Sequence, residues 1–234
     1  LLWTDWNNLV SCSRDETIRI WQIKSGRYVS VGEGRFHQGT VLSLCSLGKT
    51  EFCSCGSDGK IIVYSDKGTP KLVIEAHDEW VWQVKAITDN IVASISEDGC
   101  VKLWQLKPFC LLASLELGNP LTALAHDQKG HILYLGDVKG NVWQVQYTLP
   151  KVNLKLLSQH VCHADKILFI KQHGGFLATG SEDNSFALWN KANMSKVFEH
   201  PHRNFVQDAH IESGVAITVS YDGQIRRFAI PLSE

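Results

Sequence analysis

The chain has 234 residues, of which 44% are hydrophobic, and its 23 basic and 24 acidic side chains give a net charge of −1. A compact domain of this length buries about 70% of its unfolded surface, so core size sets no limit on folding. The near-neutral charge excludes a disordered polyanion and makes direct nucleic-acid binding an unexpected role. No apolar run reaches the roughly 20 residues that span a bilayer, and no signal peptide is recognisable, so we expect no membrane partner.

Seven cysteines form an odd set without the dense spacing of a secreted disulfide scaffold. Most lie in apolar stretches, where free cysteine behaves as a small buried hydrophobe. We therefore expect a reducing, intracellular location, in the cytoplasm or the nucleus. His160, Cys162 and His163 lie close together, but no second pair at zinc-finger spacing completes four ligands. We expect no metal site and no cofactor.

In chain order, six segments share a turn, usually with an acidic residue, that is followed by a strand-like run ending in an aromatic residue. The segments are SRDETIRIW (13–21), GSDGKIIVY (56–64), SEDGCVKLW (96–104), VKGNVWQV (138–145), SEDNSFALW (181–189) and SYDGQIRRF (220–228). They recur with a period of about 41 residues, which indicates a repeat architecture.

Within each unit, a β-rich run, an Asp-Gly or related turn and an alternating run predict a hairpin, with one further strand on each side. Four short antiparallel strands per unit are typical of a β-propeller blade, whereas a helical solenoid would show a 3.6-residue apolar period. The sequence thus predicts an all-β fold in one domain, 1–234. The predicted blades are 1–31, 32–75, 76–117, 118–159, 160–200 and 201–234.

Polar residues recur at fixed offsets from each turn Asp: a hydroxyl four positions earlier, a His 20 or 21 positions earlier and an aromatic six positions later. The sets are His37, Ser54 and Asp58; His77, Ser94, Asp98 and Trp104; His163, Thr179, Asp183 and Trp189; and His202, Thr218 and Asp222. A catalytic triad needs one such constellation, so recurrence argues against an enzyme. We predict a structural chain in which Asp accepts from His, His meets the hydroxyl and the hydroxyl meets the Trp indole.

These joint recurrences resemble the WD-repeat family of β-propellers over essentially the whole chain. The Trp-Asp dipeptide of the family is Trp104-Gln105 and Trp189-Asn190 here. The fourth segment departs further, with Leu135, Lys139 and Val145 at the hydroxyl, Asp and aromatic positions. We expect that blade to be the least rigid or a specialised one, with Trp143 partly replacing the aromatic.

The resemblance implies that three positions per repeat face one rim of the propeller: those three and five after the His, and the one before the turn Asp. The candidates for partner binding are Arg14, Trp80, Trp82, Glu97, Lys166, Glu182, Phe205 and Tyr221. Aromatic and Arg side chains are common interface anchors, so we expect a docking site for peptide segments. Arg14 and Lys166 would match acids on the partner, and Glu97 and Glu182 would match bases. In the alternative interpretation, one or both Trp side chains pack between blades.

The resemblance favours a non-catalytic scaffold or adaptor in a multiprotein complex, with other proteins as partners and no small-molecule substrate. The alternative is the substrate-recognition propeller of a ubiquitin ligase. A phosphopeptide reader needs clustered Arg residues, and only Arg14 stands at the rim positions.

The ends of the chain are short relative to the repeat. Only 20 residues precede Trp21 and 6 follow Phe228, and the chain opens on Leu1 with Met194 as its single methionine. We expect a piece of a longer or processed polypeptide, part of a seven-bladed ring that is truncated at both ends. This expectation includes a gap or a strained closure between Leu1 and Glu234.

Overall fold

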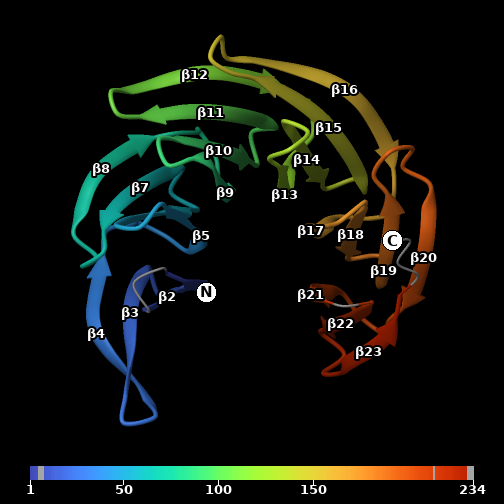
Figure 1. Ribbon diagram of the computed structural model, residues 1–234, viewed down its shortest axis with the longest axis horizontal. Coiled ribbons are helices and arrows are strands. Elements are labelled where there is room, and N and C mark those ends of the chain that lie inside the picture. The colour runs from blue at the N-terminus through green and yellow to red at the C-terminus, as the bar shows by residue number, and fades with distance from the viewer. Residues whose placement is uncertain (5–7, 213, 231–234) are drawn as a thin grey trace. The chain divides into compact units, whose positions relative to one another are not determined.

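The protein is described here by a computed structural model that covers residues 1–4, 8–212 and 214–230 (Figure 1). Every regular element among these residues is a β-strand, and none of them forms a helix long and apolar enough to cross a membrane. The chain divides into two compact units, Leu1–Leu121 and Thr122–Glu234. The repeat period alone predicts a single domain, because the period gives the number of sheets and not their grouping into units.

The first unit contains three antiparallel sheets in which consecutive strands pair (Figure 1). The first sheet has β1 (Leu2–Trp3), β2 (Leu9–Cys12), β3 (Thr17–Lys24) and β4 (Arg27–Arg35). The second has β5 (Val41–Leu47), β6 (Glu51–Gly56), β7 (Lys60–Ser65) and β8 (Pro70–Glu75). The third has β9 (Val81–Thr88), β10 (Ile91–Ser96), β11 (Cys100–Leu106) and β12 (Phe109–Glu116).

The second unit repeats this arrangement. The fourth sheet has β13 (Leu121–Asp127), β14 (Ile132–Asp137), β15 (Asn141–Thr148) and β16 (Asn153–Val161). The fifth has β17 (Ile167–His173), β18 (Phe176–Ser181), β19 (Ser185–Asn190) and β20 (Lys196–Pro201). The sixth has β21 (Val206–Glu212), β22 (Val215–Ser220) and β23 (Ile225–Ala229), three strands within the residues described.

The six sheets follow the six predicted repeats, with different outer limits. β4 pairs with β3 along its whole length, from Lys24 opposite Arg27 to Thr17 opposite Arg35, so the first sheet extends past the predicted limit at residue 31. The reason is a long hairpin closed by Ser25 and Gly26, both with positive φ. The predicted gap or strained closure at Glu234 lies outside the described residues.

The Asp-Gly turn of each repeat also ties one sheet to the next within a unit. Gly59 has a φ of +76°, and a Cβ there would lie 2.4 Å from the His77 carbonyl oxygen, so only glycine fits. The Gly59 carbonyl accepts hydrogen bonds from the Ala76 and His77 amides at 3.0 Å each. The turn of the second sheet therefore positions the histidine that belongs to the third.

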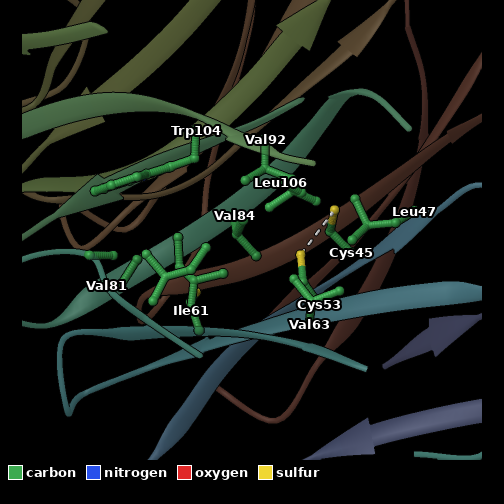
Figure 2. Packing of buried hydrophobic residues seen from close by; sticks show 13 residues of the cluster. Cys45, Leu47, Cys53, Ile61, Val63, Val81, Val84, Val92, Trp104 and Leu106 are labelled. Carbon is green, nitrogen blue, oxygen red and sulfur yellow. Dashed lines mark hydrogen bonds between the residues drawn. The ribbon is translucent and has the colours of Figure 1, made fainter. Parts of the chain in front are cut away.

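One hydrophobic core cluster of the first unit lies between its second and third sheets. Ile61, Cys53 and Val63 of the second sheet face Val81 and Val84 of the third (Figure 2). The Cys53 and Cys45 thiols lie on paired strands with their sulfur atoms 3.7 Å apart. All seven cysteines are free thiols. Packing of this kind fixes the sheets that carry the recurring turns described below.

Ion pairs join neighbouring sheets at the opposite end of the repeat from these turns. In the first unit, buried Glu51 accepts from Lys107 of the next sheet at 2.7 Å. In the second unit, buried Asp127 accepts from Lys191 of the next sheet at 2.5 Å. Because each acid is largely shielded from water, removal of its lysine would leave a buried charge unpaired, which costs more than breaking a surface ion pair.

Candidate functional site

The third sheet contains a continuous hydrogen-bond chain through four side chains. His77 Nδ1 lies 2.8 Å from Asp98 Oδ2, and His77 Nε2 lies 2.8 Å from Ser94 Oγ. The Trp104 indole N–H donates to the same Ser94 Oγ at 2.9 Å. Since Asp98 accepts and the indole only donates, the directions follow: Trp104 to Ser94, Ser94 to His77 and His77 to Asp98.

The fifth sheet repeats this chain with Thr in place of Ser. His163 lies 2.9 Å from Asp183 and 2.7 Å from Thr179, and the Trp189 indole donates to Thr179 at 2.8 Å. The second sheet has His37 between Asp58 and Ser54, at 2.9 and 2.7 Å. There Tyr64 replaces the Trp, with its hydroxyl 3.2 Å from Ser54 Oγ. The structure thus brings together all three predicted sets in these sheets.

The electrostatics of the third sheet favour a charged Asp98 beside a neutral His77. Burial acts to raise the pKa of Asp98, but hydrogen bonds from the Cys100 amide and from His77 outweigh it, so its pKa is below the ordinary value. Burial also lowers the pKa of His77, and this effect exceeds the opposing influence of Asp98. The same balance, with His163 as the first opposing donor, lowers the pKa of Asp183.

The sixth sheet differs at one residue. The Arg226 guanidinium lies between the predicted partners: it contacts His202 Nδ1 and forms an ion pair with Asp222 at 2.7 Å. His202 Nε2 lies 3.2 Å from Thr218 Oγ1. Arg can only donate, so Nδ1 of His202 accepts and Nε2 carries the proton, the reverse of the other sheets. Within the described part of the chain, Arg226 separates His202 from Asp222, and these two form no direct hydrogen bond. The prediction of a direct pair is therefore wrong for this sheet.

The fourth sheet has a different polar centre. Asp137, which is fully buried, accepts from the Trp143 indole at 2.9 Å and from the Asn141 side-chain amide at 2.7 Å. It also accepts from the backbone amides of Asn141 and Lys139, at 2.9 Å each. Trp143 is buried, so this sheet has a complete network of its own rather than a missing one. The signal in the sequence is Asp137, Asn141 and Trp143, shifted by two residues from the repeat frame.

The rim residues predicted to bind partners are joined in pairs by backbone hydrogen bonds. The Glu97 amide donates to the Trp80 carbonyl at 2.9 Å, the Glu182 amide to that of Lys166 at 2.9 Å, and the Tyr221 amide to that of Phe205 at 3.0 Å. Each pair therefore presents two side chains from one sheet. Arg14 is exposed in the turn between β2 and β3 and belongs to no such pair among the described residues.

A β-bulge explains how Trp82 reaches the rim. Ser96 pairs with Val81 and Ile95 pairs with Gln83, so Trp82 is the extra residue of the strand. The side chain of the extra residue in a bulge no longer follows the alternation of the strand and points in a different direction. The Trp82 indole donates to Glu97 Oε2 at 2.5 Å, and its ring centroid lies 5.6 Å from that of Trp80.

The rim aromatic side chains differ in exposure. Trp80 is 45% exposed, Phe205 36% and Tyr221 65%, whereas Trp82 is half-buried. Phe205 and Tyr221 form an edge-to-face pair with centroids 6.2 Å apart. The interpretation that Trp80 is packed away between blades is therefore not supported by its exposure. The offset of Trp82 from His77 can be read from the sequence, whereas the bulge that carries Trp82 cannot.

Successive antiparallel sheets of consecutive strands define repeats of β-propeller type, and a chain of His, hydroxyl, Asp and an aromatic side chain recurs in the second, third and fifth of them. The family described as "WD domain, G-beta repeat" matches residues 3–22, 68–105 and 153–190. The two longer matches each run from the outer strand of one sheet through the first three strands of the next. These three segments of the chain therefore match WD repeats.

Curated proteins with similar sequences are longer than this chain. Telomerase protein component 1 of Mus musculus is 25% identical over 213 residues, which are 86% of this chain and 8% of that protein. A guanine nucleotide-binding protein subunit beta of Arabidopsis thaliana is 27% identical over 198 residues, 78% of this chain and 52% of that one. The human DDB1- and CUL4-associated factor 5 is 29% identical over 115 residues, 44% of this chain and 12% of that protein.

A likeness to a solved structure supports the fold alone. The crystal structure of the computationally designed Ika8 protein matches with a TM-score of 0.77 and 24% identity, over 96% of this chain and 68% of that chain. This chain thus spans about half or less of the curated relatives named above, and two thirds of the designed protein.

Proposed function

We propose that the chain is a non-catalytic scaffold or adaptor subunit that binds segments of other proteins at the rim positions. The observation that supports this most directly is Trp80, a large apolar side chain that is 45% exposed on a rigidly bonded loop. Large aromatic side chains held in place lose little conformational entropy on binding, and they dominate interface energetics. Arg14 and Lys166 would face acids of a partner, and Glu97 and Glu182 would face bases.

The His, hydroxyl and Asp groups do not support a hydrolase. Ser94 Oγ holds an indole N–H and contacts a buried His77, so it is not presented to a substrate. The same arrangement recurs in two further sheets, where it ties the turn to the preceding loop. A structural role accounts for every one of these contacts, and so the proposal places function on the rim.

The alternative proposal is a substrate-recognition propeller of a ubiquitin ligase. It is favoured by the similarity to a protein named for its association with DDB1 and CUL4. A phosphopeptide ligand fits poorly, because Arg14 is the single arginine among the eight rim candidates.

Affinity capture from a cell lysate tests these proposals, with the wild type beside Trp80→Ala and Arg14→Ala. We expect the wild type to retain a defined set of proteins and Trp80→Ala to lose at least one of them. Ligase subunits in that set would favour the alternative. If Trp80→Ala and Arg14→Ala, folded as judged by circular dichroism, capture the same proteins as the wild type, the rim proposal is wrong.

We also propose that a further blade covers the free face of the sixth sheet, as in a seven-bladed ring. Val219 pairs with Ile225 there, and Ile225 is 75% exposed. The equivalent pair of the fifth sheet is Gly180 and Phe186, and Phe186 is fully buried in the core formed with the sixth sheet. An apolar face at a position that is buried elsewhere in the repeat supports a missing neighbour.

Hydrogen exchange tests this proposal on the chain alone and on the same residues within the native polypeptide. We expect the amides of β23 to be more strongly protected in the native polypeptide. Equal protection would contradict a covering blade.

We propose an intracellular site of action, in the cytoplasm or the nucleus. The support is seven free thiols, with Cys53 and Cys55 fully buried among apolar side chains. Imaging of the tagged native protein tests this, and accumulation in the secretory pathway would contradict it.

A further inference from the structure

One corner of the third sheet combines two tryptophans with three acids. We call it the acidic tryptophan corner, and it consists of Asp78, Glu79, Trp80, Trp82 and Glu97. Asp78 and Glu79 are exposed, and they immediately precede Trp80 in the loop that follows His77. Glu97 lies in the hairpin turn on the other side of Trp80. The acids therefore flank the tryptophans from two separate loops.

The two rings are held at an angle rather than stacked on each other. Their planes meet at 50° with centroids 5.6 Å apart, so the exposed ring of Trp80 stands open beside Trp82. Glu97 fixes this arrangement twice, because its backbone amide donates to Trp80 and its carboxylate accepts the Trp82 indole N–H. A carboxylate has two oxygen atoms, and the Trp82 bond uses one of them. A charged acceptor thus remains at the edge of the ring pair.

Lys102 of this sheet makes its contacts with other groups. Its Nζ donates to the Ala76 carbonyl at 2.8 Å and lies 5.8 Å from the centroid of the Trp104 ring. The corner keeps an excess of negative charge next to an aromatic face, and both features attract a cation.

The same repeat positions carry different chemistry in the sixth sheet. There the loop reads Arg203, Asn204 and Phe205, and Tyr221 replaces the acid in the turn. Aromatic side chains are present in both places, but the charge beside them is opposite. The acids beside the aromatic side chains therefore distinguish the third sheet from the sixth.

We propose that the acidic tryptophan corner binds a cationic side chain, a lysine or an arginine, in an extended segment of a partner protein. This inference rests on the proposed binding function of the rim and names the chemistry of one contact. The cation lies against the face of Trp80, with Glu97, Asp78 and Glu79 as counter-charges. Desolvation is small at this exposed place, so one such contact is weak alone and contributes mainly to specificity.

The test uses blocked pentapeptides with a single variable residue between glycines: Lys, Arg, Glu or norleucine at the centre. The indole N–H signals of the tryptophans are followed by NMR as each peptide is added at millimolar concentration. Trp80→Phe and Trp82→Phe assign the two signals. We expect the Lys and Arg peptides to shift the Trp80 signal, and the comparison of these two shows which cation is preferred. Equal shifts with Glu or norleucine would overturn the proposal.

Glu97→Gln is the decisive variant, because glutamine keeps an acceptor for the Trp82 indole while removing the charge. We expect Glu97→Gln together with Asp78→Asn to weaken Lys binding by about threefold to fivefold, as for an exposed ion pair. Asp89→Asn, in the exposed turn between β9 and β10 of the same sheet and outside the rim candidates, is the matched control and should leave Lys binding unchanged. Unchanged binding by the double variant would overturn the role of charge.

Failure of this inference is distinguishable from failure of the proposed function. If captured proteins depend on Trp80 but the Lys and Arg peptides give no shift, the rim binds partners by other chemistry and only the inference is wrong. If neither depends on Trp80, the proposed function is also wrong.

Discussion

The fifth and sixth sheets follow one another in the second unit and carry His, Thr and Asp at the same offsets, but their hydrogen-bond chains run in opposite directions. In the fifth sheet, Thr179 accepts the Trp189 indole and donates to His163, which donates to Asp183. In the sixth, Arg226 donates to both His202 and Asp222. His202 then donates through Nε2 to Thr218.

The difference lies at one position, four residues after the turn Asp. In the fifth sheet it is Ala187, which is buried and leaves His163 and Asp183 in contact. In the sixth it is Arg226, whose guanidinium reaches His202 Nδ1, so the histidine accepts and the proton positions along the chain are reversed. Lys102 has the same position in the third sheet, but it donates to the Ala76 carbonyl and leaves His77 bonded to Asp98. The comparison teaches that the three named residues of the repeat do not fix the network without a fourth.

The largest effect is expected from removing the central hydroxyl. Thr179→Val keeps the shape of the side chain but leaves the buried Trp189 N–H and His163 Nε2 without partners, so the free energy of unfolding should fall by about 3 kcal/mol. The matched variant Thr218→Val removes a single bond of 3.2 Å and should cost about 1 kcal/mol. Urea unfolding of both variants measures the difference. Equal losses would contradict the view that the two chains differ.

A smaller effect is expected from the indole alone. Trp189→Phe removes one N–H donor and some buried area while His163 keeps its bond to Thr179, so we expect a loss of about 1–2 kcal/mol. The sixth sheet already carries Phe228 at this position. Trp80→Phe, at an exposed tryptophan, is the control and should change the midpoint of urea unfolding little. If the loss is no greater than that of the control, the indole hydrogen bond contributes nothing to the free energy of unfolding.

Much of the fold could be predicted from the sequence because the determinants are local and repeated. Asp-Gly or related turns and alternating runs recur six times, and the period alone places the sheets. The contacts of His77 with Ser94 and Asp98 also follow from offsets. The role of Arg226 gives no such signal, because Arg19 and Lys102 have the same position in other repeats and the effect depends on where a long flexible side chain ends.

The site was less accessible to sequence reasoning for a related reason. Trp82 lies at the rim because of a bulge, and a bulge changes the direction of one side chain without changing the period. Asp137 was missed because its network uses the same residue types two positions away from the repeat frame. A periodic sequence pattern gives no indication of how the sheets are grouped into two units.

The two sheets should also respond to acid over different pH ranges. Burial, Arg226 and His200 lower the pKa of His202 from 6.5 to about 4. The unfolded chain therefore binds more protons than the folded one between these values, and the contribution of His202 to stability is lost as the pH falls from 6.5 towards 4. The pKa of Asp183 is lowered from 3.8, so its contribution is lost only below that value. Urea unfolding as a function of pH should show an earlier loss that becomes smaller in His202→Gln, and the lowered pKa of His77 accounts for loss that persists in this variant.

The smallest effect, and the most specific one, concerns the titration of His202 itself. Arg226→Met removes the guanidinium and keeps most of the side-chain stem, so the pKa of His202 should rise from about 4 towards 6.5. The nitrogen chemical shifts of His202 should also show a proton on Nδ1, now free to donate to Asp222 as in the fifth sheet. Arg227→Met, at the exposed neighbouring position, is the control and should leave both readouts unchanged. A pKa that stays near 4 in Arg226→Met would mean that burial, and not the arginine, distinguishes the sixth sheet from the fifth.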